Sequence, residues 1–146
     1  MFKKSLQKGF TLIELMVVVS IIGVLMAAGI LAFTNAQQSA PDSKRKADMD
    51  AISKAQEQYA AQNNAYPVAA NISSAILTYF PNGLIPKDPK NSGSSIYTLT
   101  GNTGSTFCSC ALLEKVGTGN ATTVGAGGVC AYAAAGGNYF CTSQRQ

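Results

Sequence analysis

The apolar positions of this chain are concentrated near its N-terminus instead of recurring through several elements. Between Phe10 and Phe33 the one ionisable side chain is that of Glu14. A helix of about 20 apolar residues crosses the hydrocarbon core of a bilayer, so this run is long enough to span a membrane with some tilt. Backbone groups in lipid must be hydrogen-bonded within their own segment. We therefore expect helix even at the β-branched residues 17–19.

Three lysines, Lys3, Lys4 and Lys8, precede the apolar run and predict its orientation. Positively charged flanks stay on the cytoplasmic side of a membrane, so residues from 35 onwards are expected outside. No Ala-x-Ala pattern follows the run, and a conventional secretory signal therefore fits poorly.

A second, amphipathic pattern runs from residue 42 to about residue 63. Opposite charges recur four residues apart beside a weak apolar stripe, which predicts a helix with one solvated face and one face packed on a head. Pro41 is expected to kink this helix or restart it, with Ser39 as its N-cap. The Tyr-Pro pair at 66–67 forbids continuation, so the helix is expected to end at residues 63–64. The charge pairs are Lys44–Asp48, Lys46–Asp50 and Asp50–Lys54.

From residue 68 onwards Gly, Ser, Thr and Asn become frequent and charge nearly vanishes. Apolar side chains at four-residue spacing predict a short helix over residues 71–80. Further on, β-branched and aromatic runs predict a small antiparallel sheet packed against the outer half of the long helix. The expected strands are 96–100, 107–113, 129–133 and 139–142, with Gly-rich loops at 101–104, 117–128 and 136–138.

Four cysteines, Cys108, Cys110, Cys130 and Cys141, all lie in the last third of the chain. An even number in a small Gly-rich region indicates disulfides made in an oxidising compartment, which agrees with the predicted export. Cys108 and Cys110 share one face of a strand, so a bond between them is awkward. We expect each to pair with Cys130 or Cys141, and both assignments stay open. A four-cysteine zinc site is disfavoured because its usual C-x₂₋₄-C pairs are missing.

Charge and composition exclude several classes of function. The formal charge is +4, but three of the positive side chains precede the apolar run, and without them about +1 remains. That is too little for a nucleic-acid interface, and the basic residues 44–46 are interpreted as part of a helix with one solvated face and one face packed on the head, in preference to a site for DNA or lipid. The chain has no His, no Gly-x-Ser-x-Gly and no phosphate-binding loop, so we expect no enzyme and no cofactor. Asp88 and Glu114 are too few acids for a calcium site in the head, and we expect no metal.

Glu14 is the anomaly of the apolar run. A carboxylate at mid-bilayer costs on the order of 2.5–3.5 kcal/mol, and less near an interface. From one helix alone two interpretations stay open. Either Glu14 lies near the cytoplasmic face and is solvated, or it meets a cationic partner.

Residues 8–15, Lys-Gly-Phe-Thr-Leu-Ile-Glu-Leu, closely resemble the processing site of type IV prepilins. In that family a membrane-bound prepilin peptidase cuts after the glycine, the new N-terminal residue is N-methylated, and a Glu occupies its fifth position. The resemblance implies cleavage after Gly9 and methylation of Phe10. It also implies that Glu14 pairs with the α-amino group of a neighbouring subunit and sets the register of assembly, without a catalytic role.

The resemblance implies an α+β fold of the type IV pilin kind. A long N-terminal helix, first membrane-spanning and then amphipathic, packs on a small antiparallel β-sheet head with disulfides. Gly23 lies near a family glycine associated with helix flexibility, whereas Leu31 stands where the family has a proline, and the proline of this chain comes later, at Pro41. The expected parts are a removed leader at 1–9, a transmembrane or filament-core helix at 10–34, an extracytoplasmic helix half at 35–64 and the head at 65–146.

Many members of that family close a C-terminal loop with one disulfide. A Cys130–Cys141 bond would copy that arrangement and would leave Cys108 to pair with Cys110. It is an alternative to the cross-pairing expected from the strand geometry.

The leading hypothesis is a structural subunit of a type IV pilus-like filament that serves adhesion, motility or DNA uptake. The implied partners are identical subunits in a helical filament, the prepilin peptidase, an assembly platform in the inner membrane and minor pilins. The implied location is the inner membrane first and the extracellular pilus afterwards. A minor pilin or a type II secretion pseudopilin is the alternative, because both share the processing motif. A single-pass membrane-anchored protein is the third reading.

Overall fold

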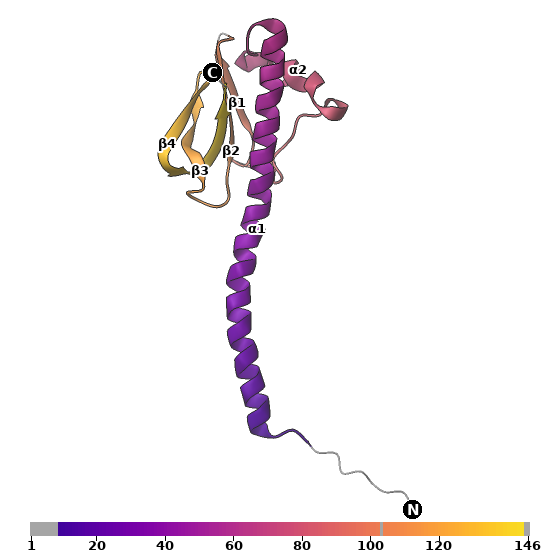
Figure 1. The fold of residues 1–146 in the computed structure, drawn as a ribbon, viewed down its shortest axis with the longest axis vertical. Helices are drawn as coiled ribbons and strands as arrows, with labels where there is room; N and C mark the ends of the chain where they lie inside the picture. Colours follow the sequence, from indigo (N-terminus) through magenta and orange to yellow (C-terminus); the bar gives the residue numbers. More distant parts are fainter. Residues whose placement is uncertain (1–8, 103, 145–146) are drawn as a thin grey trace, which may run out of the picture. The chain divides into compact units, whose positions relative to one another are not determined.

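The computed structural model describes residues 9–102 and 104–144 of the chain (Figure 1). The predictions made for Lys3, Lys4 and Lys8 fall outside these residues. The chain divides into two units, Met1–Gln37 and Gln38–Gln146, which are described separately below.

The described elements begin with one long helix, continue through short helical turns and end in a sheet. They are α1 (Leu12–Asn63), η1 (Ala69–Asn71), α2 (Ile72–Ile76), η2 (Leu77–Tyr79), η3 (Pro81–Gly83), β1 (Thr98–Asn102), β2 (Thr106–Leu112), β3 (Gly119–Ala126), β4 (Val129–Gly137) and β5 (Tyr139–Ser143).

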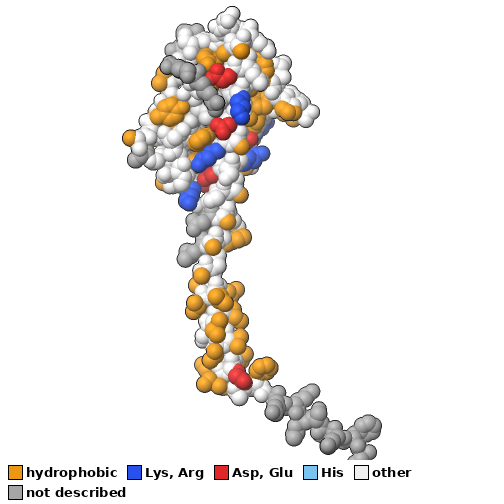
Figure 2. Space-filling model, in the orientation of Figure 1, with side chains coloured by type: hydrophobic (Ala, Val, Ile, Leu, Met, Phe, Trp, Pro, Cys, Tyr) orange, Lys and Arg blue, Asp and Glu red, His pale blue; other side chains and the backbone are white. Residues whose placement is uncertain are grey.

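The first unit contains the apolar part of α1, which is long and apolar enough to cross a membrane. Among the described residues its large apolar side chains are exposed, as the exposed fractions of 76% for Leu12 and 64% for Phe33 illustrate. Figure 2 shows hydrophobic side chains along this part of the helix, whereas the Lys and Arg side chains drawn in blue and most of the acidic side chains drawn in red belong to the other unit. The helix predicted over the apolar run is confirmed, and its apolar surface requires lipid or other protein as a partner.

The predicted restart of the helix at Pro41 is wrong, because α1 runs as one element from Leu12 to Asn63. Ser39 therefore lies inside the helix and is not an N-cap, and its carbonyl oxygen accepts a hydrogen bond from Ser43 Oγ at 2.9 Å. Proline removes one backbone donor from a helix, and that loss is local. The turns that follow are held by packing on the head, which sustains the helix beyond the proline.

The predicted end of the helix at residues 63–64 is confirmed. Asn64 has a positive φ of 52°, the left-handed conformation that commonly ends a helix. The backbone N–H of Tyr66 then donates to the carbonyl oxygen of Gly104 at 2.7 Å, which ties the chain to the loop before β2. The short helix expected over residues 71–80 is divided between α2 and the flanking turns η1 and η2.

The described strands form one antiparallel sheet of order β1-β2-β5-β3-β4. β2 and β5 pair in regular register, with Cys110 opposite Cys141, whereas β3 and β5 share only the pair Ala121–Tyr139. The β3–β4 ribbon (residues 119–137) has several register shifts along its length. The long helix with a small antiparallel sheet, as predicted, is confirmed.

Strand β3 was not predicted, because its residues lie within the segment read as a Gly-rich loop at 117–128. The physical reason is close approach of the backbones. A Cβ at Gly119 would collide with the carbonyl oxygen of Tyr139 on β5, so only glycine permits this contact. Gly119 and Gly125 mark close backbone contacts within the sheet, whereas Gly127 and Gly128 form the turn between β3 and β4.

Strand β2 separates two cores because its side chains alternate between its faces. One face meets the helix: Ala111 packs with Met49 and Ile52 of α1 and with Ile72 and Ile76 of α2. The other face carries the buried Cys108 and Cys110, which pack with Ala121 of β3 and Cys141 of β5. Residues 107–111 are consequently buried on both faces.

Candidate functional site

The N-terminal segment that resembles a processing site lies directly before α1. Phe10 is 91% exposed, and no atom lies within 4 Å of where a Cβ on Gly9 would be placed. The Gly9–Phe10 peptide bond therefore lies in an uncovered segment ahead of the helix. An exposed bond outside regular secondary structure is accessible to a peptidase.

The carboxylate of Glu14 is held by the start of its own helix. Its Oε2 accepts hydrogen bonds from the backbone N–H and the hydroxyl of Thr11, both at 2.8 Å. In return, the backbone N–H of Glu14 donates to Thr11 Oγ1 at 3.3 Å. This reciprocal arrangement is a capping box, and it places negative charge at the positive end of the helix dipole.

The capping box shows how the carboxylate of Glu14 is satisfied in an apolar run. Within one chain the carboxylate has partners, so it need not be an unsatisfied charge in an apolar run. The signal was present in the sequence, because Thr-x-x-Glu before an apolar run is the capping-box pattern, and the sequence interpretation overlooked it. Gly23, the predicted point of flexibility, lies inside α1 with open space around it.

A second cluster lies in the head, around the fully buried side chain of Arg45. Its guanidinium makes a bidentate contact with Asp88, with Nε and Nη2 at 2.7 and 3.0 Å from the two carboxylate oxygens. Nη1 donates to Asp42 at 2.8 Å and to Glu114 at 3.1 Å. Of the basic residues 44–46, Lys44 lies on the solvated face of the helix and Arg45 on the face packed against the head. Its charge faces inward because three carboxylates from separate segments converge there.

These segments are α1, the loop before β1 and the end of β2. The carboxylate of Asp42 also accepts the backbone N–H groups of Glu114 and Lys115 at 2.8 and 2.9 Å. Lys90 Nζ closes the cluster from outside, 3.2 Å from Glu114 Oε2. Arg45 and Lys90 thus form ion pairs with acids of other segments, and these contacts are not the i,i+4 pairs predicted along the helix.

Burial and hydrogen bonding shift the pKa values of the acids in this cluster in opposite directions. Burial by itself raises the pKa of Asp42, but the backbone N–H groups of Glu114 and Lys115 and the Arg45 guanidinium outweigh it and hold the pKa below its usual range. For Asp88, burial again raises the pKa, and hydrogen bonds from Arg45 and the backbone N–H of Lys90 lower it further than burial raises it. Both acids therefore hold their charge in the folded head.

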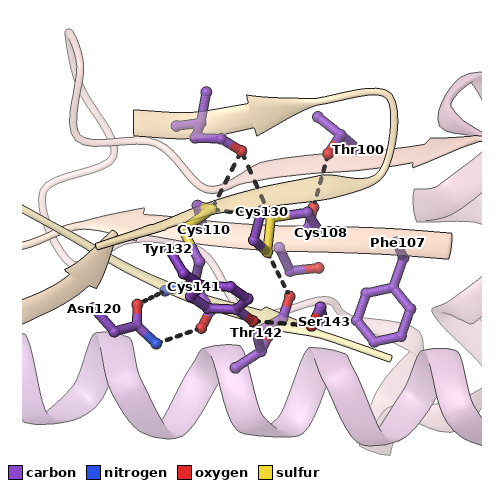
Figure 3. The surroundings of a disulfide bond; sticks show 12 residues. Thr100, Phe107, Cys108, Cys110, Asn120, Cys130, Tyr132, Cys141, Thr142 and Ser143 are labelled. Carbon is purple, nitrogen blue, oxygen red and sulfur yellow. Dashed lines mark hydrogen bonds between the residues drawn. A yellow bond between two sulfur atoms is a disulfide. The ribbon is translucent and has the colours of Figure 1, made fainter. Parts of the chain in front are cut away.

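The third cluster consists of the cysteines, which form two disulfides, Cys108–Cys130 and Cys110–Cys141 (Figure 3). Each of the two cysteines on β2 is thus joined to one of the later pair, and the alternative pairing of Cys130 with Cys141 is not present. Among the described residues, the His, Cys, Asp and Glu side chains close enough together to hold a metal are these four cysteines, whose sulfurs are engaged in the disulfides.

Comparison with known proteins finds similarity in the N-terminal part of the chain. Residues 4–30 match the family model described as the prokaryotic N-terminal methylation motif. Over 64 residues, 44% of this chain, the sequence is 41% identical to the type IV major pilin protein PilA of Myxococcus xanthus (strain DK1622), and the match covers 29% of that protein. Over 32 residues, 22% of this chain, it is 69% identical to the type IV major fimbrial protein FimA of Dichelobacter nodosus, and the match covers 20% of that protein.

The match therefore spans less than a third of the length of these curated relatives. No solved structure gives a significant match. An apolar helix that begins at a methylation motif and continues into a disulfide-bonded β head defines a pilin-like protein. Over its N-terminal part the chain is similar to type IV pilins.

Replacing Arg45 tests the cluster that holds the head. Arg45→Met keeps much of the side-chain volume but leaves three carboxylates without their cation, and breaking a buried pair in this way costs about 3–5 kcal/mol. We expect a loss of that size in the free energy of unfolding, measured by urea denaturation of the full chain in detergent. Lys44→Met, at an exposed neighbouring position, serves as the control and should change stability by less than about 0.5 kcal/mol. Equal effects of the two substitutions would contradict the role given to Arg45.

The lowered pKa values of Asp42 and Asp88 predict the response to acid. A depressed pKa means that the folded head binds fewer protons than the unfolded chain, so the stabilisation is complete above the unfolded pKa of about 3.9 and is lost as the pH falls through the folded values. Urea denaturation should show stability falling from about pH 4 downward. In Arg45→Met this fall should be shallower, because protonation then relieves repulsion among the acids. An unchanged acid profile in the variant would count against the cluster.

Proposed function

We propose that this chain is the precursor of a structural subunit of a type IV pilus filament. The observation that carries the proposal is the methylation motif at the exposed start of a helix whose described apolar side chains are exposed. The names of the relatives support it, since they are a major pilin and a major fimbrial protein. Nothing in this role requires catalysis by the chain.

Processing is the first step of the proposal. A prepilin peptidase cuts the bond between Gly9 and Phe10, and Phe10 becomes the methylated N-terminus. The new α-amino group has a reference pKa of about 7.7–8.0 and is mostly cationic near neutral pH. In an apolar environment that cation needs an anion.

Glu14 is the proposed anion, supplied by a neighbouring subunit. The capping box supports this role, because it keeps the carboxylate at the very start of the helix, beside its own Thr11. A single charge pair between subunits offsets the burial of both groups and fixes the axial register. Before assembly, the hydrogen bonds from Thr11 satisfy the same carboxylate within the membrane.

The apolar helix then serves twice. In the inner membrane it anchors the subunit in lipid, and in the filament the apolar surfaces of neighbouring helices cover one another. A contact between unlike surfaces that does not close into a ring generates a helical polymer of identical subunits. The heads coat such a filament and supply its surface for adhesion, motility or DNA uptake, with the assembly platform and minor pilins as further partners.

Intact mass spectrometry of sheared extracellular filaments from the native host tests the proposal directly. We expect an abundant chain that starts at methylated Phe10 and gains four hydrogens on reduction of its two disulfides. A mature chain confined to the membrane fraction would favour a minor pilin or pseudopilin. A chain that still begins at Met1 in a host that makes pili would overturn the proposal.

The charge of Glu14 is tested separately. Glu14→Gln keeps the shape of the side chain but removes its charge, and we expect normal cleavage after Gly9 with at least a tenfold loss of sheared filament, measured by immunoblot of both fractions. Asp50→Asn removes an exposed acid from the other half of α1 and should leave filament yield unchanged. Normal yield in Glu14→Gln would exclude the charge pair.

A further inference from the structure

The two disulfides differ in what they join. Cys110 and Cys141 are register partners on the neighbouring strands β2 and β5, so their bond follows the pairing of those strands. Cys108 and Cys130 lie on β2 and β4, which are separated in the sheet by β5 and β3. Their Cα atoms are nonetheless 5.2 Å apart, so the β3–β4 ribbon folds across the face of β2 that carries the cysteines.

Closure of the ribbon encloses the sulfurs. Cys108 and Cys110 are fully buried, Cys141 is 2% exposed and Cys130 is half-buried. All four sulfur atoms lie within 4.8 Å of one another, under Ala121 and the partly buried Val124 and Tyr139. Figure 3 shows the cysteines gathered in this enclosed space between strands. A thiol of Cys108, Cys110 or Cys141 in this position is out of reach of a large oxidant.

The polar surroundings of the sulfurs also disfavour reaction. The carbonyl oxygen of Val124 lies 3.6 Å from the sulfur of Cys108 and 3.4 Å from that of Cys110. Cys130 and Cys141 have the carbonyl oxygens of Thr142 and Thr123 at 3.4 and 3.9 Å. A carbonyl oxygen accepts a hydrogen bond from a thiol but repels a thiolate. In a reduced, closed head these oxygens would therefore favour the unreactive thiol form.

Disulfide formation requires the opposite conditions. A cysteine thiolate must attack a sulfur of an oxidant's disulfide, forming a mixed disulfide and releasing one thiol of the oxidant. A second cysteine thiolate then displaces the oxidant's other sulfur as a thiol and forms the internal bond. Each disulfide formed in the head oxidises two cysteine thiols and reduces one disulfide of the oxidant to two thiols. The two protons of the cysteine thiols end on the two thiols of the oxidant.

We propose that both disulfides are made while the β3–β4 ribbon is still open, by thiol–disulfide exchange with a disulfide-bearing oxidant. A head that closes while reduced is then trapped with four unreacted thiols. The mature head is consequently formed by oxidation of an exported chain whose β3–β4 ribbon has not yet closed. This holds whether or not the chain polymerises, so its failure and that of the filament proposal are distinguishable.

The test compares two orders of addition with the full-length chain in detergent micelles, using oxidised glutathione as the probe. In one arm the reduced, denatured chain refolds with oxidised glutathione present from the start. In the other it refolds under reductant, the reductant is removed by desalting, and oxidised glutathione is added afterwards. Acid quenching, alkylation and intact mass give the number of free thiols against time.

We expect bond formation to be at least tenfold slower in the arm that refolds first, and to speed up in urea below the unfolding transition. Equal rates in the two arms would overturn the proposal, whether because the closed head reacts freely or because the reduced head does not close.

A pair of glycine variants locates the barrier in the ribbon. Gly125→Ala places a Cβ against the carbonyl oxygen of Val129 at a positive φ of 71°, so it should loosen the ribbon. Gly93→Ala has a comparable φ of 58° but open space around it, outside the ribbon. In the arm that refolds first, Gly125→Ala should oxidise at the rate of the open chain and Gly93→Ala at the slow wild-type rate. Equal rates for the two variants would show that ribbon closure is not the barrier.

Discussion

The architecture of the head depends on one buried cation. Arg45 sits on α1 with no exposed surface, and its guanidinium reaches Asp42, Asp88 and Glu114. A buried charge is tolerated only when its partners are in place, so the cluster specifies where the loop before β1 and the end of β2 must lie against the helix. Backbone N–H groups that donate to Asp42 and Asp88 extend the same constraint to the main chain.

Strand β2 connects the ion cluster to the two cores of the head, because each of its faces packs in a different core. The cluster fixes its end, its inner face packs Ala111 on the helix, and its outer face presents Cys108 and Cys110 to the β3–β4 ribbon. Because β2 both packs on the helix and carries two of the cysteines, it positions the disulfides relative to the helix. Glycine at position 119 permits the close approach that the enclosed sulfur cluster needs.

The apolar part of α1 does not depend on a buried ion cluster. Its described large apolar side chains are exposed, and the carboxylate of Glu14 is satisfied locally by Thr11. A helix built in this way is stable in lipid without depending on the head. The proposed role as a pilus subunit gives that helix a use in both lipid and filament, and the proposed pairing of Glu14 with a new N-terminus connects the two.

The sequence by itself determined the features that depend on neighbouring residues. The apolar run predicted the helix, the Tyr-Pro pair its end, the motif at residues 8–15 the family, and the i,i+2 spacing of Cys108 and Cys110 their shared face. Only the tertiary structure decided the inward turn of Arg45, whose partners Asp88 and Glu114 are 43 and 69 residues away. It also decided strand β3 and the choice of Cys130 for Cys108, because long-range backbone contacts set both and local composition does not encode them.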